Sequence, residues 1–138
     1  MNVRRREGQS LIEFALVLPL LLILVFGIID FSIGLYDKAV VTNASREGAR
    51  AGIVYRSPVL SSGDLTTAVT AVVQNYCSTY LVTFGAAASP IITVTGGGAS
   101  GNQLTVTVKY NYVFSVIPNF IPGITNPTLT ATTVMRME

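Results

Sequence analysis

The chain has 138 residues, of which half are hydrophobic and only 12% are charged, with a formal net charge of +2. It contains one cysteine and no histidine, so it cannot form an internal disulfide and lacks the commonest general base and metal ligand. This composition allows one small domain beside a hydrophobic segment, and argues against an enzyme, a bound cofactor, a metal site and nucleic-acid binding.

A hydrophobic segment, residues 11–29, follows a basic N-terminus that contains Arg4, Arg5 and Arg6. About 20 apolar residues cross a bilayer, so the segment predicts a transmembrane helix. The positive-inside rule places its N-terminus in the cytoplasm and the rest of the chain outside. A cleaved secretory signal peptide fits less well, because Glu13 interrupts the apolar region and no A-x-A-like site follows it.

The helical pattern continues beyond the apolar segment, with apolar and small residues at i, i+3/i+4 spacing. We therefore predict one helix over residues 10–54, about 65 Å long at 1.5 Å per residue, which exceeds the need of a membrane anchor. Pro19 removes one helical hydrogen bond and is expected to kink or open the helix locally. Gly27 and Gly34 weaken it further.

After a break at residues 57–63, an apolar stripe predicts a second helix over residues 64–81. The free Cys77 is expected to be a small buried hydrophobe on this helix, with an intermolecular disulfide as the alternative. Three residues are candidates for the N-cap of the helix: Ser62, Gly63 or Asp64.

Three segments predict antiparallel strands: residues 91–95, which are short and β-branched, and residues 102–114 and 128–138, which alternate. One face of the sheet is apolar and the other is rich in threonine. The expected apolar face comprises Leu104, Val106, Val108, Tyr110, Tyr112 and Phe114, together with Leu129, Ala131, Met135 and Met137. The predicted fold class is α+β, with a long N-terminal hydrophobic helix and a small head of one helix packed on a three-stranded antiparallel sheet.

Two loops connect these strands. The glycine-rich residues 96–102 precede a strand and lack the lysine and helix of a phosphate-binding loop, so they predict a hairpin connection. Residues 115–126 predict a long loop packed down by Ile117, Phe120 and Ile121. An exposed contact surface is the alternative for this second loop.

The N-terminal half carries a recognisable motif. A short basic leader ends in Gly8, Glu13 is the fifth residue after it, and Phe14 follows, as in a G/xxxxE[YF] processing motif. The stretches "ALVLPLLLILVFGIIDF", "ASREGARAG" and the C-terminal "LTATTVMRME" are similar to those of one family. The sequence resembles the TadE-like proteins of the tight-adherence (Tad) pilus system, a branch of the type IV pilin superfamily. Residues 8–54 carry most of this resemblance.

The resemblance implies cleavage between Gly8 and Gln9 by an integral-membrane prepilin peptidase. The expected organisation is a cleaved leader (1–8), a long helix (9–56) and a head (57–138). Pilin-like assemblies are thought to pair the new amino group of Gln9 with the Glu13 carboxylate of a neighbouring subunit. Phe14 and Pro19 belong to the same assembly segment. The implied partners are other copies or other pilins, the peptidase and an assembly platform in the cytoplasmic membrane.

The leading hypothesis is a structural pilin-like subunit, either the main filament subunit or a minor pseudopilin. Its location would be the cytoplasmic membrane before assembly and an extracellular pilus afterwards. The alternative is a single-pass membrane-anchored envelope protein with an extracytoplasmic binding domain, which requires neither cleavage nor Glu13.

Overall fold

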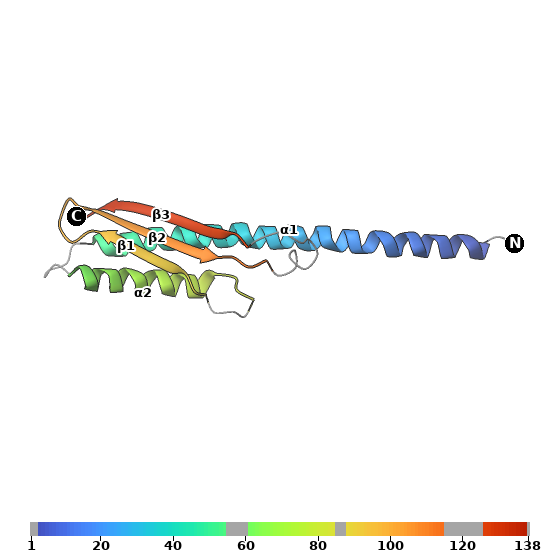
Figure 1. Ribbon diagram of the computed structural model, residues 1–138, viewed down its shortest axis with the longest axis horizontal. Coiled ribbons are helices and arrows are strands. Elements are labelled where there is room, and N and C mark those ends of the chain that lie inside the picture. The colour runs from blue at the N-terminus through green and yellow to red at the C-terminus, as the bar shows by residue number, and fades with distance from the viewer. Residues whose placement is uncertain (1–2, 55–60, 85–87, 115–125, 138) are drawn as a thin grey trace. The chain divides into compact units, whose positions relative to one another are not determined.

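The computed structural model describes residues 3–54, 61–84, 88–114 and 126–137. The elements in chain order (Figure 1) are α1 (Val3–Ile53), α2 (Ser62–Tyr80), β1 (Ile91–Gly96), β2 (Gln103–Asn111) and β3 (Thr128–Arg136). The chain divides into two units, Met1–Ile33 with Phe114–Thr125 and a head unit of Gly34–Val113 with Asn126–Glu138. These elements confirm the predicted α+β fold with a long N-terminal helix and a three-stranded antiparallel sheet.

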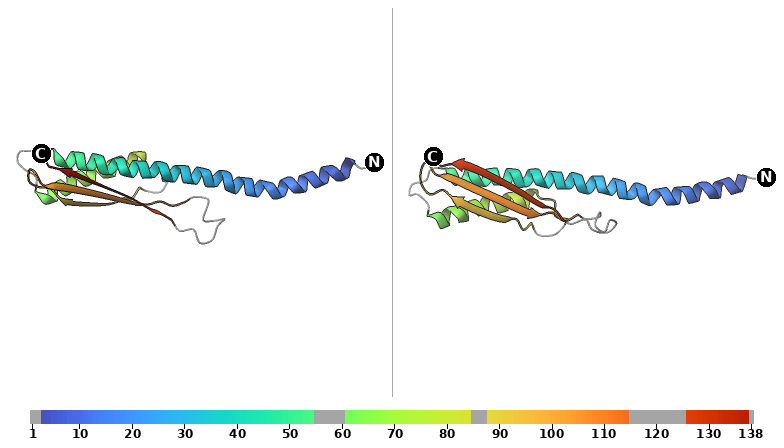
Figure 2. Two further views of the ribbon diagram at one scale, coloured as in Figure 1. Left: turned by 90° about the horizontal axis from the view of Figure 1, so that it is seen from above. Right: turned by 45° about the horizontal axis from the view of Figure 1, so that its top comes forward.

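Helix α1 starts at Val3, seven residues before the expected start, because arginines favour helix and no proline interrupts this region. It continues through Pro19, and Figure 2 shows its axis bending in the blue N-terminal part. Among the described residues, α1 is the one helix long and apolar enough to cross a membrane. Its most apolar window of 18 residues has a mean hydropathy of 2.8, and none of that window is buried in the structure.

The sheet has the order β1-β2-β3, and both pairs are antiparallel (Figure 1). The predicted alternation in β2 is confirmed, because Leu104, Val106 and Val108 are buried and the residues between them are more exposed. The predicted strand over residues 102–114 is too long, since β2 ends at Asn111. Both neighbouring strands begin near this end of β2: β1 pairs from Ile91 with Lys109, and β3 pairs from Thr128 with Asn111.

The hairpin between β1 and β2 confirms the prediction for residues 96–102. Gly96 has a φ of +82°, and a Cβ atom there would lie 2.1 Å from the carbonyl oxygen of Gln103. The turn therefore requires glycine at this position. The predicted loop at residues 115–126 lies outside the described residues, apart from Asn126.

Helix α2 buries the stripe Leu65, Val69, Val73 and Cys77, which confirms the expectation of a buried cysteine. The three N-cap candidates, Ser62, Gly63 and Asp64, were wrong, because Ser61 is the N-cap. Ser61 has extended backbone angles, and its Oγ accepts a hydrogen bond of 3.2 Å from the Asp64 N–H. Its hydroxyl also donates to the Asp64 carboxylate at 2.7 Å. This reciprocal arrangement resembles a capping box and favours Ser61 over the candidates inside the helix.

The core of the head unit lies between the sheet and the two helices, which occupy the same side of the sheet (Figure 2). Two glycines of α1 allow this close packing. A Cβ atom on Gly48 would lie 2.4 Å from Val73 Cγ2, and one on Gly52 would lie 2.4 Å from Leu104 Cδ2. The absent side chains let α1 approach both α2 and β2 at van der Waals distance.

We expect Gly48→Ala to destabilise the head unit, although alanine favours helix by about 1 kcal/mol. Overpacking costs about 1–3 kcal/mol, so a net loss of up to about 2 kcal/mol is expected in thermal unfolding of the full chain in detergent. Gly34→Ala is the matched control, because its Cβ would meet Tyr112 at an ordinary 3.5 Å. Equal effects of the two substitutions would contradict the packing role of Gly48.

Candidate assembly and processing site

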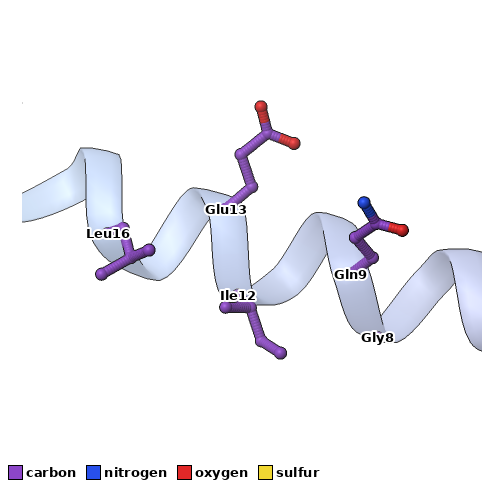
Figure 3. A pocket seen from close by; sticks show the side chains of 5 residues that line it. All are labelled: Gly8, Gln9, Ile12, Glu13 and Leu16. Atoms are coloured by element: carbon purple, nitrogen blue, oxygen red, sulfur yellow. The ribbon is translucent and has the colours of Figure 1, made fainter.

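Five residues near the start of α1 line one open hollow: Gly8, Gln9, Ile12, Glu13 and Leu16. Figure 3 shows that Gln9 and Glu13, one helical turn apart, project from one side, whereas Ile12 and Leu16 project from another. All five residues come from one helix and are exposed. The hollow is therefore a helix surface, which another molecule can reach, rather than an enclosed pocket.

The predicted cleavage site, between Gly8 and Gln9, is sterically open, since nothing lies within 4 Å of a Cβ atom built on Gly8. The same peptide bond lies inside α1, where backbone groups are engaged in i to i+4 hydrogen bonds. A peptidase acting here must first open this part of the helix. Glycine makes that easier, because it weakens a helix by about 1 kcal/mol relative to alanine.

The remaining assembly residues lie on the same exposed helix. Glu13 comes close to Gln9, while Phe14 and Pro19 lie outside the hollow and are also exposed. Among residues 8–54 and the other residues whose side chains are described, none forms an ion pair with the Glu13 carboxylate. Because an unpaired carboxylate is costly in an apolar segment, Glu13 gains most from a partner supplied by another molecule.

A second carboxylate, Asp37, was not singled out by the sequence. Its side chain is fully buried, and Oδ1 accepts a hydrogen bond of 3.0 Å from the Val82 N–H, just beyond α2. Oδ2 is buried and has no hydrogen-bond partner in the described part of the chain. Desolvation raises the pKa of Asp37, and the bond from Val82 opposes this shift. The helical spacing could have indicated that Asp37 is buried. Asp37 lies four residues after Ile33 and four before Val41, so the three residues share one face of α1.

Asp37 lies in a small cluster of titratable groups contributed by three elements. Burial raises the pKa of Tyr110 on β2, and the charges of Asp37 and Cys77 raise it further. Burial also raises the pKa of the Cys77 thiol to about 11, so this thiol is protonated and unreactive at neutral pH. The described residues include no group of three or more acidic or cysteine side chains arranged to hold a metal ion.

The family described as TadE-like protein matches residues 8–50. This range starts at the glycine before the predicted cleavage site and includes Glu13, Phe14 and Pro19. The N-terminal helix of the chain is therefore similar to the TadE-like family over this range. The match ends within α1, so it covers the apolar helix and leaves the sheet and α2 outside it. No curated protein and no solved structure matches the chain.

We expect Asp37→Asn to make the protein more stable at neutral pH. The unfolded carboxyl titrates near 3.8 and the folded one at a higher pH, so the folded state binds more protons between these values. The free energy of unfolding therefore falls as pH rises through that window, and stays lower above it. Asparagine keeps an acceptor for the Val82 N–H without a buried charge.

Thermal unfolding of both proteins across pH 3–8 checks this expectation. The difference in Tm should be smallest at acidic pH and should grow toward neutral pH. A difference that is independent of pH would show that Asp37 acts only through packing.

Proposed function

We propose that this chain is a structural subunit of a Tad-type pilus, either as a filament subunit or as a minor pseudopilin that supports assembly. The observation that carries the proposal is the family match over residues 8–50, on a helix whose apolar side chains are exposed. Large apolar surfaces of this kind need lipid or other protein to cover them. A membrane meets this need before assembly, and neighbouring helices meet it afterwards.

In this proposal the prepilin peptidase and the membrane assembly platform act in turn on the N-terminal part of α1. Cleavage after Gly8 produces an α-amino group at Gln9. That amine pairs with the Glu13 carboxylate of a neighbouring copy, which offsets the cost of placing each charge among apolar side chains. Pairing then sets the axial register between subunits, with the head outside the membrane.

The first test concerns processing. The exported protein is expected to begin at Gln9, so its intact mass should be lower than that of the full chain by residues 1–8. Gly8→Leu should block cleavage, because a bulky side chain replaces the open backbone at the site. Gly27→Leu is the matched control, since Gly27 also has nothing within 4 Å of a built Cβ atom. A mature chain that starts at Met1 would exclude the pilin proposal.

The second test separates a pilus subunit from a membrane-anchored envelope protein. Glu13→Ala should leave membrane insertion intact or improve it slightly, because it removes a charge from the apolar segment. Filament yield after shearing should fall at least tenfold, since the amine of the neighbouring Gln9 loses its partner. Glu13→Gln should give an intermediate yield, because it keeps hydrogen bonding without charge.

Membrane fractionation of each Glu13 variant provides the control for insertion. If Glu13→Ala produces filaments at the wild-type level, another contact sets the register. An envelope protein anchored by α1 would lose no function with either substitution.

A further inference from the structure

The two edges of the sheet are formed by β1 and β3 (Figure 1). They differ in how their outward backbone groups are protected from pairing with other strands. Tyr112 donates its N–H to the Pro127 carbonyl and Met137 donates to the Asn102 carbonyl, so even-numbered residues of β2 face β3. The odd-numbered residues of β2 consequently bond to β1. In the observed register, Ile92 and Val94 of β1 then direct their N–H and C=O groups away from the sheet.

Positively charged side chains protect the β3 edge from pairing with another strand. The Lys38 ammonium donates a hydrogen bond to the Thr130 carbonyl, which faces outward, and Arg136 ends the strand. Among the described residues, no cation bonds to the β1 edge. Residues 65–108, which include β1, contain no charged side chain. No described residue bonds to the outward groups of Ile92 and Val94. Natural proteins usually protect a sheet edge with charges, because a free edge pairs with other strands.

We propose that the β1 edge pairs with the β1 edge of a second copy, which joins the two sheets into one of six strands. The edge is self-complementary about Val94: in an antiparallel pair Val94 faces Val94 of the second copy, and Ile92 faces its Gly96. The strand sequence IITVTG is β-branched, uncharged and free of proline, which favours such pairing.

The exposed face of β1 supports the same register. Thr93 and Thr95 lie on the threonine-rich face, where Thr107 and Thr132 already share a hydroxyl contact of 3.1 Å. Across the new pair, Thr93 would face Thr95 of the second copy, and cross-strand threonine pairs are favourable. Pairing β1 with β3 instead would displace Lys38 from Thr130 and place Arg136 against an uncharged edge, which costs free energy.

The antiparallel orientation of the β1–β1 pair determines whether it can form within one filament or between two. Lys38 contacts Thr130 and Ser45 contacts Thr133, so the head part of α1 runs in the same direction as β3 and therefore as β1. An antiparallel β1 pair thus joins two copies whose helices point in opposite directions. If the proposed function holds, neighbours within one filament point the same way, so the contact links two separate filaments.

A contact of two six-residue strands is small, and a single one is expected to be weak. Many such contacts along two filaments would together strengthen the binding between the filaments through multivalency. This reasoning places the interaction between assembled filaments rather than between free subunits, and it requires a covalent trap to detect a single pair.

Cysteine cross-linking of the full chain in detergent tests the pair without any need for filaments. In T93C/T95C, each new cysteine faces the other cysteine of the second copy in a non-hydrogen-bonded pair, with Cα atoms about 4.5 Å apart. That separation suits a disulfide. Mild oxidation should therefore produce at least fivefold more covalent dimer than in T130C/T132C, the matched pair on the exposed face of β3. The wild type, whose thiol at Cys77 is buried, provides the background.

Charge variants give a second, independent measurement. T93K/T95K and T93E/T95E should each give little covalent dimer with a zero-length carbodiimide reagent. Mixing them should give at least fivefold more, because the lysines of one copy then face glutamates of the other and an amide bond traps the pair. Circular dichroism confirms that each variant folds. Equal cross-linking of the β1 and β3 pairs, or no rescue on mixing, would overturn the proposal. Cross-linking of T95C to T132C in a mixed sample would replace it with a β1–β3 contact.

Discussion

A single helix, α1, has to satisfy two different surroundings, and the rest of the structure depends on how it does so. Its N-terminal part exposes large apolar side chains on every side, as expected for a segment that needs lipid or like helices around it. Its C-terminal part instead buries one face, with Val41, Ala44 and Ala49 in the head core. The switch from an all-round apolar surface to a one-sided apolar stripe marks the boundary between these two roles.

The head core is built around the small residues of α1. Gly48 and Gly52 leave room for valine and leucine side chains from α2 and β2, so the three elements share one core although the sheet is only three strands wide. A small sheet with one covered face cannot bury much surface by itself. The long helix therefore contributes a core face to the head as well as an apolar segment.

Two carboxylates in α1 illustrate different ways of placing an acid in apolar surroundings. Asp37 is buried, receives one backbone hydrogen bond from Val82, and has a raised pKa that favours its neutral form. Glu13 is exposed on the apolar part of the helix, where no described residue pairs with it. The first acid is accommodated within the chain, and the second is left for a partner outside it. This contrast supports an assembly role for Glu13 and a structural role for Asp37.

Much of the fold followed from periodicity. Alternation in residues 104–108 predicted the buried face of β2, and the stripe that includes Leu65, Val69 and Val73 predicted α2. These are local patterns. The end of β2 at Asn111 was missed because it depends on where two other strands begin, which alternation within one strand does not encode. Ser61 was missed as the N-cap because consecutive polar residues offered several local solutions, and the extended backbone of Ser61 decided between them.

The proximity of the candidate site residues could be predicted from sequence, whereas the surroundings of the buried acid could not. Gly8, Gln9 and Glu13 form a linear motif on one helix, so their spacing alone places them close together, as Figure 3 shows. The role of Asp37 depends on Val82, which is 45 residues away in the sequence. Spacing along a helix indicates which face a residue occupies, but a contact of that kind is created only by the packing of α2.

The charges of the chain support one order of events in the proposed function. Residues 1–8 hold three of the nine basic residues and one of the seven acidic residues, so cleavage would leave six of each. The arginines of the leader would first hold the N-terminus in the cytoplasm during insertion. Their removal would then eliminate the strongest electrostatic barrier to moving this end of the helix through the membrane. At the same step the amine of Gln9 appears beside the apolar surface that carries Glu13, so one cleavage both releases the helix and creates the charge that pairs it with a neighbour.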